Sequence, residues 1–165
     1  MNNETTLTLT PDEFAVRFAP AAQILDATPE ERCYPRSLKS ASVNKYGVKV
    51  GDIFYASWGY EQTNVNFFQI IALVGETSVR IREVYLDLEE EDAFSSMSAN
   101  RSYALPSEIL PAARHASFVD DQKNGDLKRV SNKYGEPTIK VGRTGGYQTI
   151  ANQYKGETVY ESWYY

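Results

Sequence analysis

The spacing of apolar residues changes along the chain, and it predicts a helix near the N-terminus. Thr10 can cap this helix, Pro11 suits its first position, and Glu13 stands three residues after the cap, as in a capping box. Apolar residues then recur at helical spacing at Phe14, Phe18, Ala21, Ala22 and Leu25. Pro20 interrupts this pattern, so we expect a short helix followed by a bend.

From Gly47 the apolar period becomes two, which predicts strands. Three alternating or apolar stretches cover 48–58, 67–74 and 79–83, separated by a polar loop at 59–66 and a turn at Gly75-Glu76. A shift of phase at Gly51-Asp52 indicates a bulge or a tight bend. Consecutive strands with short links form an antiparallel meander, and such a meander commonly curls into a small SH3-like barrel.

The second half of the chain is less regular. The acidic run Asp87–Asp92 is expected in a solvated loop. Leu127–Ser131 and Thr138–Val141 predict a hairpin, Gly142–Gly146 a break that opens a short helix through Tyr154, and Thr158–Tyr165 a last strand. The predicted class is therefore α+β, with an N-terminal helix and surface loop in 1–46 and a β-rich core in 47–165, in one compact domain.

Composition fits one globular domain of 165 residues with an aromatic content of 13%. Cys33 is the only cysteine, so an intramolecular disulfide is excluded and a reducing compartment is favoured. The polar start of the chain and the lack of a long apolar run predict a cytoplasmic protein that does not span a membrane. Net charge is −5, but residues 47–92 hold nine acids and three bases, whereas residues 93–165 hold nine bases and seven acids.

No catalytic motif stands out, so we expect a protein that is not an enzyme and that needs no metal or cofactor. A Cys33–His115 dyad and a cation held by Asp120-Asp121 or by the acidic run are the weaker alternatives. The glycines in 142–146 can form an anion nest with Arg143, but a sharp turn explains them as well.

A basic segment at 128–143 suggests contact with nucleic acid. Its bases and the tyrosines between and beside them are Lys128, Arg129, Lys133, Tyr134, Lys140, Arg143 and Tyr147. On such a surface, basic side chains bind the phosphates and tyrosine rings stack on the nucleobases. The alternative is that these lysines and arginines are only the solvated face of a sheet.

The most distinctive stretch is 51–69, GDIFYASWGYEQTNVNFFQ. It resembles a segment of small, largely uncharacterised proteins encoded by bacteriophages and other mobile elements of bacteria, in which this pattern joins two strands. Leu127–Val130, Ile139–Val141 and Tyr154–Gly156 fit the second half of that family more loosely, without a tryptophan expected near Tyr154. The resemblance covers about half the chain and implies a non-catalytic protein that acts in a bacterial cytoplasm.

The SWGYEQTN part of this stretch has two interpretations. Trp58 can plug a barrel end while Thr63 or Asn64 bonds the backbone of the turn. Alternatively, Trp58, Tyr60, Gln62 and Asn64 form an aromatic and amide patch that grips a base, a sugar or a peptide.

Two functions follow as hypotheses. The first is an interaction protein of a phage or mobile element that binds a host protein and inhibits a defence system such as restriction or CRISPR immunity. The second is a nucleic-acid-binding module of SH3-like or OB-like type. For the second, the candidate residues are Lys128, Arg129, Lys140, Arg143 and Tyr147. The sequence leaves the oligomeric state open.

Overall fold

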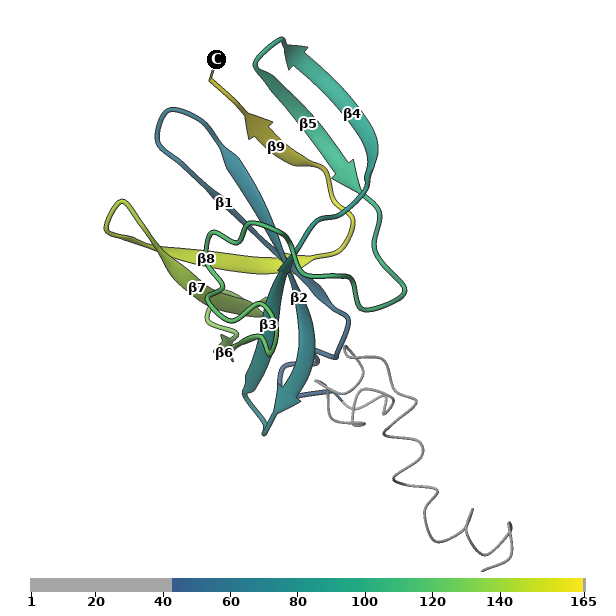
Figure 1. Cartoon of the computed structure of the whole chain (residues 1–165), viewed down its shortest axis with the longest axis vertical. Coiled ribbons are helices and arrows are strands. Elements are labelled where there is room, and N and C mark those ends of the chain that lie inside the picture. Colours follow the sequence, from purple (N-terminus) through teal and green to yellow (C-terminus); the bar gives the residue numbers. More distant parts are fainter. Residues whose placement is uncertain (1–42, 165) are drawn as a thin grey trace, which may run out of the picture. The chain divides into compact units, whose positions relative to one another are not determined.

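The computed structural model describes residues 43–164, which form two packed β-structures (Figure 1). The strands are β1 (Ile53–Trp58), β2 (Asn64–Val74), β3 (Ser78–Val84), β4 (Leu88–Ser95), β5 (Ser98–Tyr103), β6 (Asp126–Ser131), β7 (Thr138–Thr144), β8 (Tyr147–Tyr154) and β9 (Val159–Ser162). Six of them close a barrel in the order β1-β2-β3-β6-β7-β8, and β4, β5 and β9 form a separate sheet in the order β4-β5-β9.

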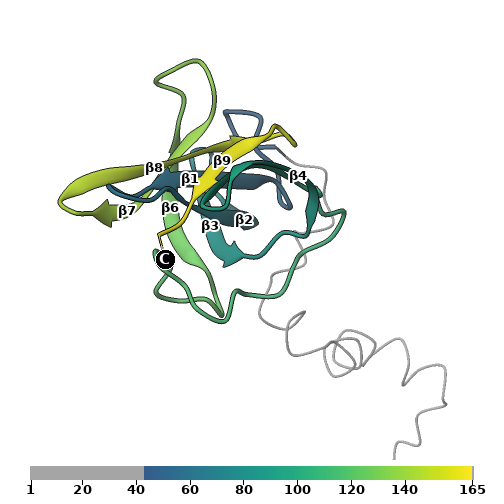
Figure 2. The ribbon, with the colours of Figure 1, turned by 90° about the horizontal axis from the view of Figure 1, so that it is seen from above.

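The barrel follows from the two-residue period of its strands. Alternate residues of β1 and β2 point inward, so that Phe54 and Phe68 pair across the strands and are fully buried in the core. The barrel closes where β1 pairs with β8, in the register Ile53↔Tyr154. Figure 2 shows this arrangement from above. The irregularity expected at Gly51-Asp52 is a bend that precedes β1, with Gly51 at a φ of +95°.

A second apolar core lies between the barrel wall and the three-stranded sheet. The outward residues Ile53, Phe67 and Tyr154 pack there with Val159 of β9. The Tyr154 hydroxyl accepts from the Tyr103 amide at 3.0 Å and donates to the Tyr103 carbonyl at 3.3 Å. Burial raises the pKa of Tyr154, which keeps the hydroxyl available as a donor. This core fixes the small sheet to the barrel.

A long loop, 104–125, connects β5 to β6 without regular structure. Side chains from the barrel hold it. Gln69 is fully buried, donates to the Glu108 carbonyl at 2.8 Å and accepts from the Leu110 amide at 2.7 Å. Arg82 donates to the Leu110 carbonyl at 3.1 Å. Loops of this length without secondary structure are uncommon unless they have a function. This anchored loop is therefore a candidate part of a functional site.

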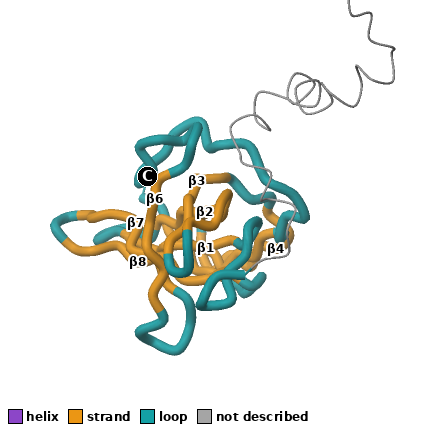
Figure 3. Tube along the Cα trace, turned by 90° about the horizontal axis from the view of Figure 1, so that it is seen from below, coloured by secondary structure: helices purple, strands orange, loops and turns teal. Residues whose placement is uncertain are grey.

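The prediction of an α+β class is wrong for the described residues, which contain strands and loops but no helix (Figure 3). The short helix expected after Gly142 is instead the end of β7, a two-residue turn and β8. Gly145 and Gly146 have φ of 57° and 86°, and positive φ at both central residues suits a hairpin turn. The predicted N-terminal helix, and with it most of the predicted 1–46 unit, lies outside the described residues.

The acidic run is also a strand rather than a loop. Glu89 to Asp92 lie in β4, and all eight residues of this strand are exposed. The charges are tolerated because the strand lies at a sheet edge in water, and Arg101 of β5 stands opposite Glu91. The meander of β1 to β3, the β6–β7 hairpin, the last strand and the barrel are confirmed.

Candidate functional site

The SWGYEQTN segment turns at one end of the barrel. Trp58 ends β1 and Asn64 begins β2, and the two residues pair across the strands. Trp58 meets Phe118 of the long loop edge-on, with ring centroids 5.5 Å apart, and its indole nitrogen donates to the Asn66 side chain at 2.5 Å. Gly59 follows with a φ of +129°. Trp58 is therefore packed at the barrel end, where the structural interpretation of this segment places it.

A pocket of about 320 Å³ lies beside Trp58, where β2 begins and β9 ends. It is lined by Trp58, Thr63, Asn64, Val65, Asn66, Ser117, Glu161, Ser162 and Trp163. The Ser162 amide donates to the Thr63 carbonyl at 3.0 Å, and the Thr63 amide donates to the Ser162 hydroxyl at 2.8 Å, so β9 is held against the turn. Two indoles beside amides, hydroxyls and a carboxylate suit a flat polar ring or a sugar.

Of the four residues predicted in this segment, Trp58 and Asn64 reach the pocket. Tyr60 is fully exposed on the turn, and Gln62 lies beside Tyr164, just after β9. Gln62 donates to Asn64 at 2.8 Å and accepts from the Tyr164 amide at 3.3 Å. These bonds make Gln62 a support of the pocket wall.

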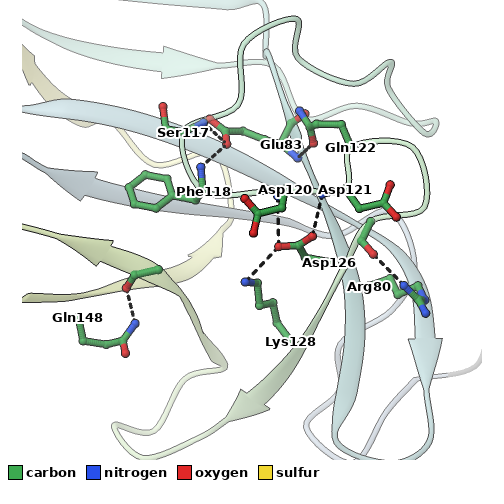
Figure 4. Close-up of polar contacts among 12 residues, drawn as sticks. Arg80, Glu83, Ser117, Phe118, Asp120, Asp121, Gln122, Asp126, Lys128 and Gln148 are labelled. Atoms are coloured by element: carbon green, nitrogen blue, oxygen red, sulfur yellow. Dashed lines mark hydrogen bonds and ion pairs between the residues drawn. The ribbon is translucent and has the colours of Figure 1, made fainter.

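A buried polar network lies behind the pocket, and sequence reasoning missed it. Figure 4 shows its members Glu83, Ser117, Phe118 and Gln122. Glu83 is only 2% exposed and points into the barrel end. Its carboxylate accepts from the Asn66 amide group and from the backbone amides of Ser117 at 2.9 Å and Phe118 at 3.1 Å. The sequence could have predicted the burial of Glu83, because strand alternation places it on the same inward side of β3 as Val79 and Ile81.

Gln122 completes the attachment of the loop. Its side-chain oxygen accepts from the Glu83 amide at 2.9 Å, and its nitrogen donates to the carbonyls of Glu83 and Ala113 at 3.2 and 3.1 Å. The Ala113 amide in turn donates to the Glu83 carbonyl at 2.8 Å. Glu83 therefore binds the loop through both its side chain and its backbone.

The predicted basic segment divides between two faces of the barrel. Neighbouring residues on a strand point to opposite sides, and Val130 is buried, so Lys128 lies on the inward side and Arg129 on the outward side. Lys128 forms an ion pair with Asp126 at 3.2 Å. Arg129 is exposed, and so is Lys140, which neighbours the buried Ile139 on β7.

Arg143 shares the outward face with Lys140. A bulge between Lys140 and Gly142 shifts the register, after which Arg143 pairs with Gln148 and both are exposed. Tyr147 pairs with Thr144 at the hairpin tip and is 82% exposed, but it lies on the other side of the hairpin from Arg143. The structure thus brings Arg129, Lys140 and Arg143 to one surface, which we call the basic face, and it leaves Lys128 and Tyr147 outside that surface.

The carboxylate of Asp126 is surrounded by donors (Figure 4). The amides of Asp121 and Asp120 donate to it at 3.0 and 3.4 Å, and Lys128 lies beside it. Burial acts to raise the pKa of Asp126, but these donors lower it by more, so the net pKa is below its usual value. Asp120 and Asp121 contribute backbone amides here, and the Asp121 carboxylate accepts from the Asn124 amide at 2.9 Å. The carboxylates of Asp126 and Asp121 are therefore occupied by protein donors.

Two weaker candidates receive no support from the geometry. His115 is exposed in the long loop, and its partner in the considered dyad, Cys33, lies outside the described residues. Within 43–164, no group of three or more histidine, cysteine, aspartate or glutamate side chains is arranged to hold a metal ion. In the same part of the chain, no helix is long and apolar enough to cross a membrane.

Comparisons with protein-family models, with curated proteins and with solved structures find no match to this chain.

Proposed function

We propose that the protein is a non-catalytic nucleic-acid-binding module that contacts phosphates through its basic face. The observation that carries this proposal is that Arg129, Lys140 and Arg143 are exposed on one side of the barrel and form no ion pair with another described residue. Two other bases of the segment 126–155 differ: Lys128 is paired with Asp126, and Lys155 is paired with Glu136. The unpaired bases are thus free to bind an anionic partner.

The distribution of charge supports the same proposal. Residues 126–155 contain six bases and two acids, a net charge of +4, although the whole chain is at −5. The strands β4, β5 and β9 contain five acids and one base, a net charge of −4. A polyanion would therefore be attracted to β6–β8 and repelled by the small sheet, which orients its approach.

The neighbourhood of Arg129 and Lys140 argues against a purely structural role. Val130 of β6 pairs with Ile139 of β7. Arg129 and Lys140 are the next residues on these two strands, and both point outward. Like charges placed next to each other across a sheet destabilise it. The loop that joins their strands carries Tyr134, which is 69% exposed and has the Lys133 ammonium 5.6 Å from its ring centroid. Exposed tyrosines beside bases suit unpaired nucleobases, so single-stranded nucleic acid is the preferred ligand class.

The test is fluorescence anisotropy with a labelled single-stranded oligonucleotide over a series of salt concentrations. Three phosphate contacts predict a slope of log K against log salt of about −2, because each contact on a single strand contributes roughly −0.7. Lys140→Glu and Arg143→Glu should each weaken binding and flatten the slope. Lys45→Glu, an exposed charge change outside β6–β8, is the matched control and should bind almost as the wild type does. Salt-independent binding, or equal loss in the control, would refute the proposal.

A second candidate function is favoured by the acidic sheet. An exposed strand with four consecutive acids suits a protein that occupies a basic site on a host protein, and this agrees with the resemblance to phage and mobile-element proteins. In this role the protein would inhibit a bacterial defence system such as restriction or CRISPR immunity. Expression in defended bacteria tests it: protection of an infecting phage or plasmid supports the role, and its absence against every defence system tried contradicts it.

A further inference from the structure

We propose that the free edge of β4 takes up a basic, extended segment of a partner protein as an additional strand. β4 is the outer strand of the β4-β5-β9 sheet, and all eight of its residues are exposed. Alternate residues of an edge strand direct their amide and carbonyl groups away from the sheet, where an incoming strand can pair with them. Adding a strand to such an edge is a recurrent way of binding a peptide.

The two edges of this sheet differ. At the β9 edge, Ser162 and Thr63 exchange the two bonds described above, so the residue that precedes β2 covers the end of that strand. β4 has hydrogen-bonded strand pairing on its β5 side alone within the described residues. Among the described residues, the acidic strand β4 is therefore the edge without a hydrogen-bonded neighbour at either end.

The acids of β4 that face away from the barrel have no compensating cation among the residues 43–164. Glu90 pairs with Ser102, and Asp92 pairs with Asn100, so the neighbours of both acids on this face are neutral. The base of the sheet, Arg101, lies on the other face with the buried Ala99.

Arg101 is also already engaged. It forms ion pairs with Glu91 at 3.4 Å and Glu161 at 3.6 Å, and its guanidinium carbon lies 4.9 Å from the centroid of the Trp163 ring. It therefore does not neutralise Glu90 or Asp92.

This arrangement selects the chemistry of the partner. A second copy of β4 would place acids beside acids, and like charges across a strand pair are destabilising. Nucleic acid would be repelled in the same way. A strand with lysine or arginine at alternate positions would place its cations on the same face as Glu90 and Asp92, which are themselves two residues apart. Exposed Leu88 and Phe94 near the ends of β4 offer apolar contact to such a segment.

Two peptides test the inference on the intact protein: a labelled ten-residue chain of alternating lysine and threonine, and the same chain with every backbone amide N-methylated. Both carry the same charge, but only the first keeps amide donors on the edges that could pair with β4. We expect the unmethylated peptide to bind at least about tenfold more tightly, since the loss of one or two net hydrogen bonds corresponds to that factor. Hydrogen exchange should slow at β4 amides when the unmethylated peptide binds.

Protein variants add a second test. Glu90→Lys combined with Asp92→Lys should weaken binding by about tenfold or more, because two cross-strand ion pairs become repulsions. Glu61→Lys combined with Glu76→Lys makes the same change in net charge at exposed positions elsewhere and should leave binding within about twofold.

Three results would overturn the inference: no binding, equal affinity for the two peptides, or equal weakening in the control variant. The first would mean that the acids only protect the edge from aggregation, and the second would mean simple electrostatic attraction. Because the peptide comparison uses the wild-type protein, it does not depend on the folding of a variant. The inference names a surface for the second candidate function, yet peptide binding tests the surface alone and the defence assay tests the role.

Discussion

Replacement of Glu83 tests how the long loop is held at the barrel end. Trp58 determines the direction of the hydrogen bonds around Glu83. The indole of Trp58 can only donate, so the Asn66 side-chain oxygen faces Trp58 and the Asn66 nitrogen faces Glu83. Position 83 must therefore accept from Asn66 and also from the backbone amides of Ser117 and Phe118.

The size of the effect follows from the number of donors left without an acceptor. Glu83→Gln keeps one oxygen, which can serve Asn66 or the loop but not both, and its amide nitrogen faces another donor. A buried donor without a partner costs about 1–3 kcal/mol, so we expect a loss of roughly 1–2 kcal/mol for Gln and roughly 3–4 kcal/mol for Leu, which serves none of the three. The values stay below the full sum because Ser117 is exposed, and water can reach its amide once the loop shifts.

Urea unfolding of the wild type, Glu83→Gln and Glu83→Leu measures these losses, provided that the m-values agree. Glu76→Gln, at an exposed turn, is the control and should stay within about 0.5 kcal/mol of the wild type. Hydrogen exchange supplies a local readout, because the amides of Ser117 and Phe118 should lose protection before the barrel does. If Leu unfolds at the same urea concentration as the wild type, the network does not hold the loop.

Two further predictions concern a turn and a carboxylate. Gly59→Ala should destabilise the protein by about 2 kcal/mol or more, because Gly59 has a φ of +129° and an added Cβ would lie 1.8 Å from the Gln62 carbonyl oxygen. Gly135 also has a positive φ, but the space that an added Cβ would take is open. Thermal unfolding of Gly135→Ala should therefore show a smaller loss of stability, about 1 kcal/mol, and equal losses in the two variants would contradict the steric argument. Asp126 has a folded-state pKa below its usual value despite burial, so its contribution is present above about pH 4 and is lost as the pH falls through the folded pKa. Asp126→Asn should therefore lose less stability than the wild type between about pH 5 and pH 2, and an equal loss in urea unfolding over this range would refute the assignment.

The part of the fold that could be predicted is the part with strong local patterns. β2 and β3 have large apolar side chains at inward positions, and a Gly-Glu turn separates them. β8 carries Thr149 and Ala151 at its inward positions, and such small side chains give little apolar period. Without that period, the glycines between 142 and 146 indicated the end of the strand pattern rather than a hairpin turn.

The site could be predicted only where it depends on neighbouring residues. The separation of Lys128 from Arg129 follows from strand alternation once Val130 is placed in the core. The pocket does not follow from local pattern, because it combines Trp58 with Ser117 and Trp163, which lie 59 and 105 residues further along the chain. Long-range contacts of this kind leave no periodic signal in the sequence.

The polar residues within the barrel wall explain why the loop has one conformation. Gln69 and Glu83 are almost completely buried, and apolar residues at these positions would give a simpler core. An apolar wall would bind the loop in many ways, whereas fixed donors and acceptors bind it in one. That single conformation places Phe118 against Trp58 and Ser117 in the pocket wall. The buried polar groups therefore shape the pocket at the cost of a less apolar core, while the basic face and the β4 edge, formed by strands alone, do not depend on them.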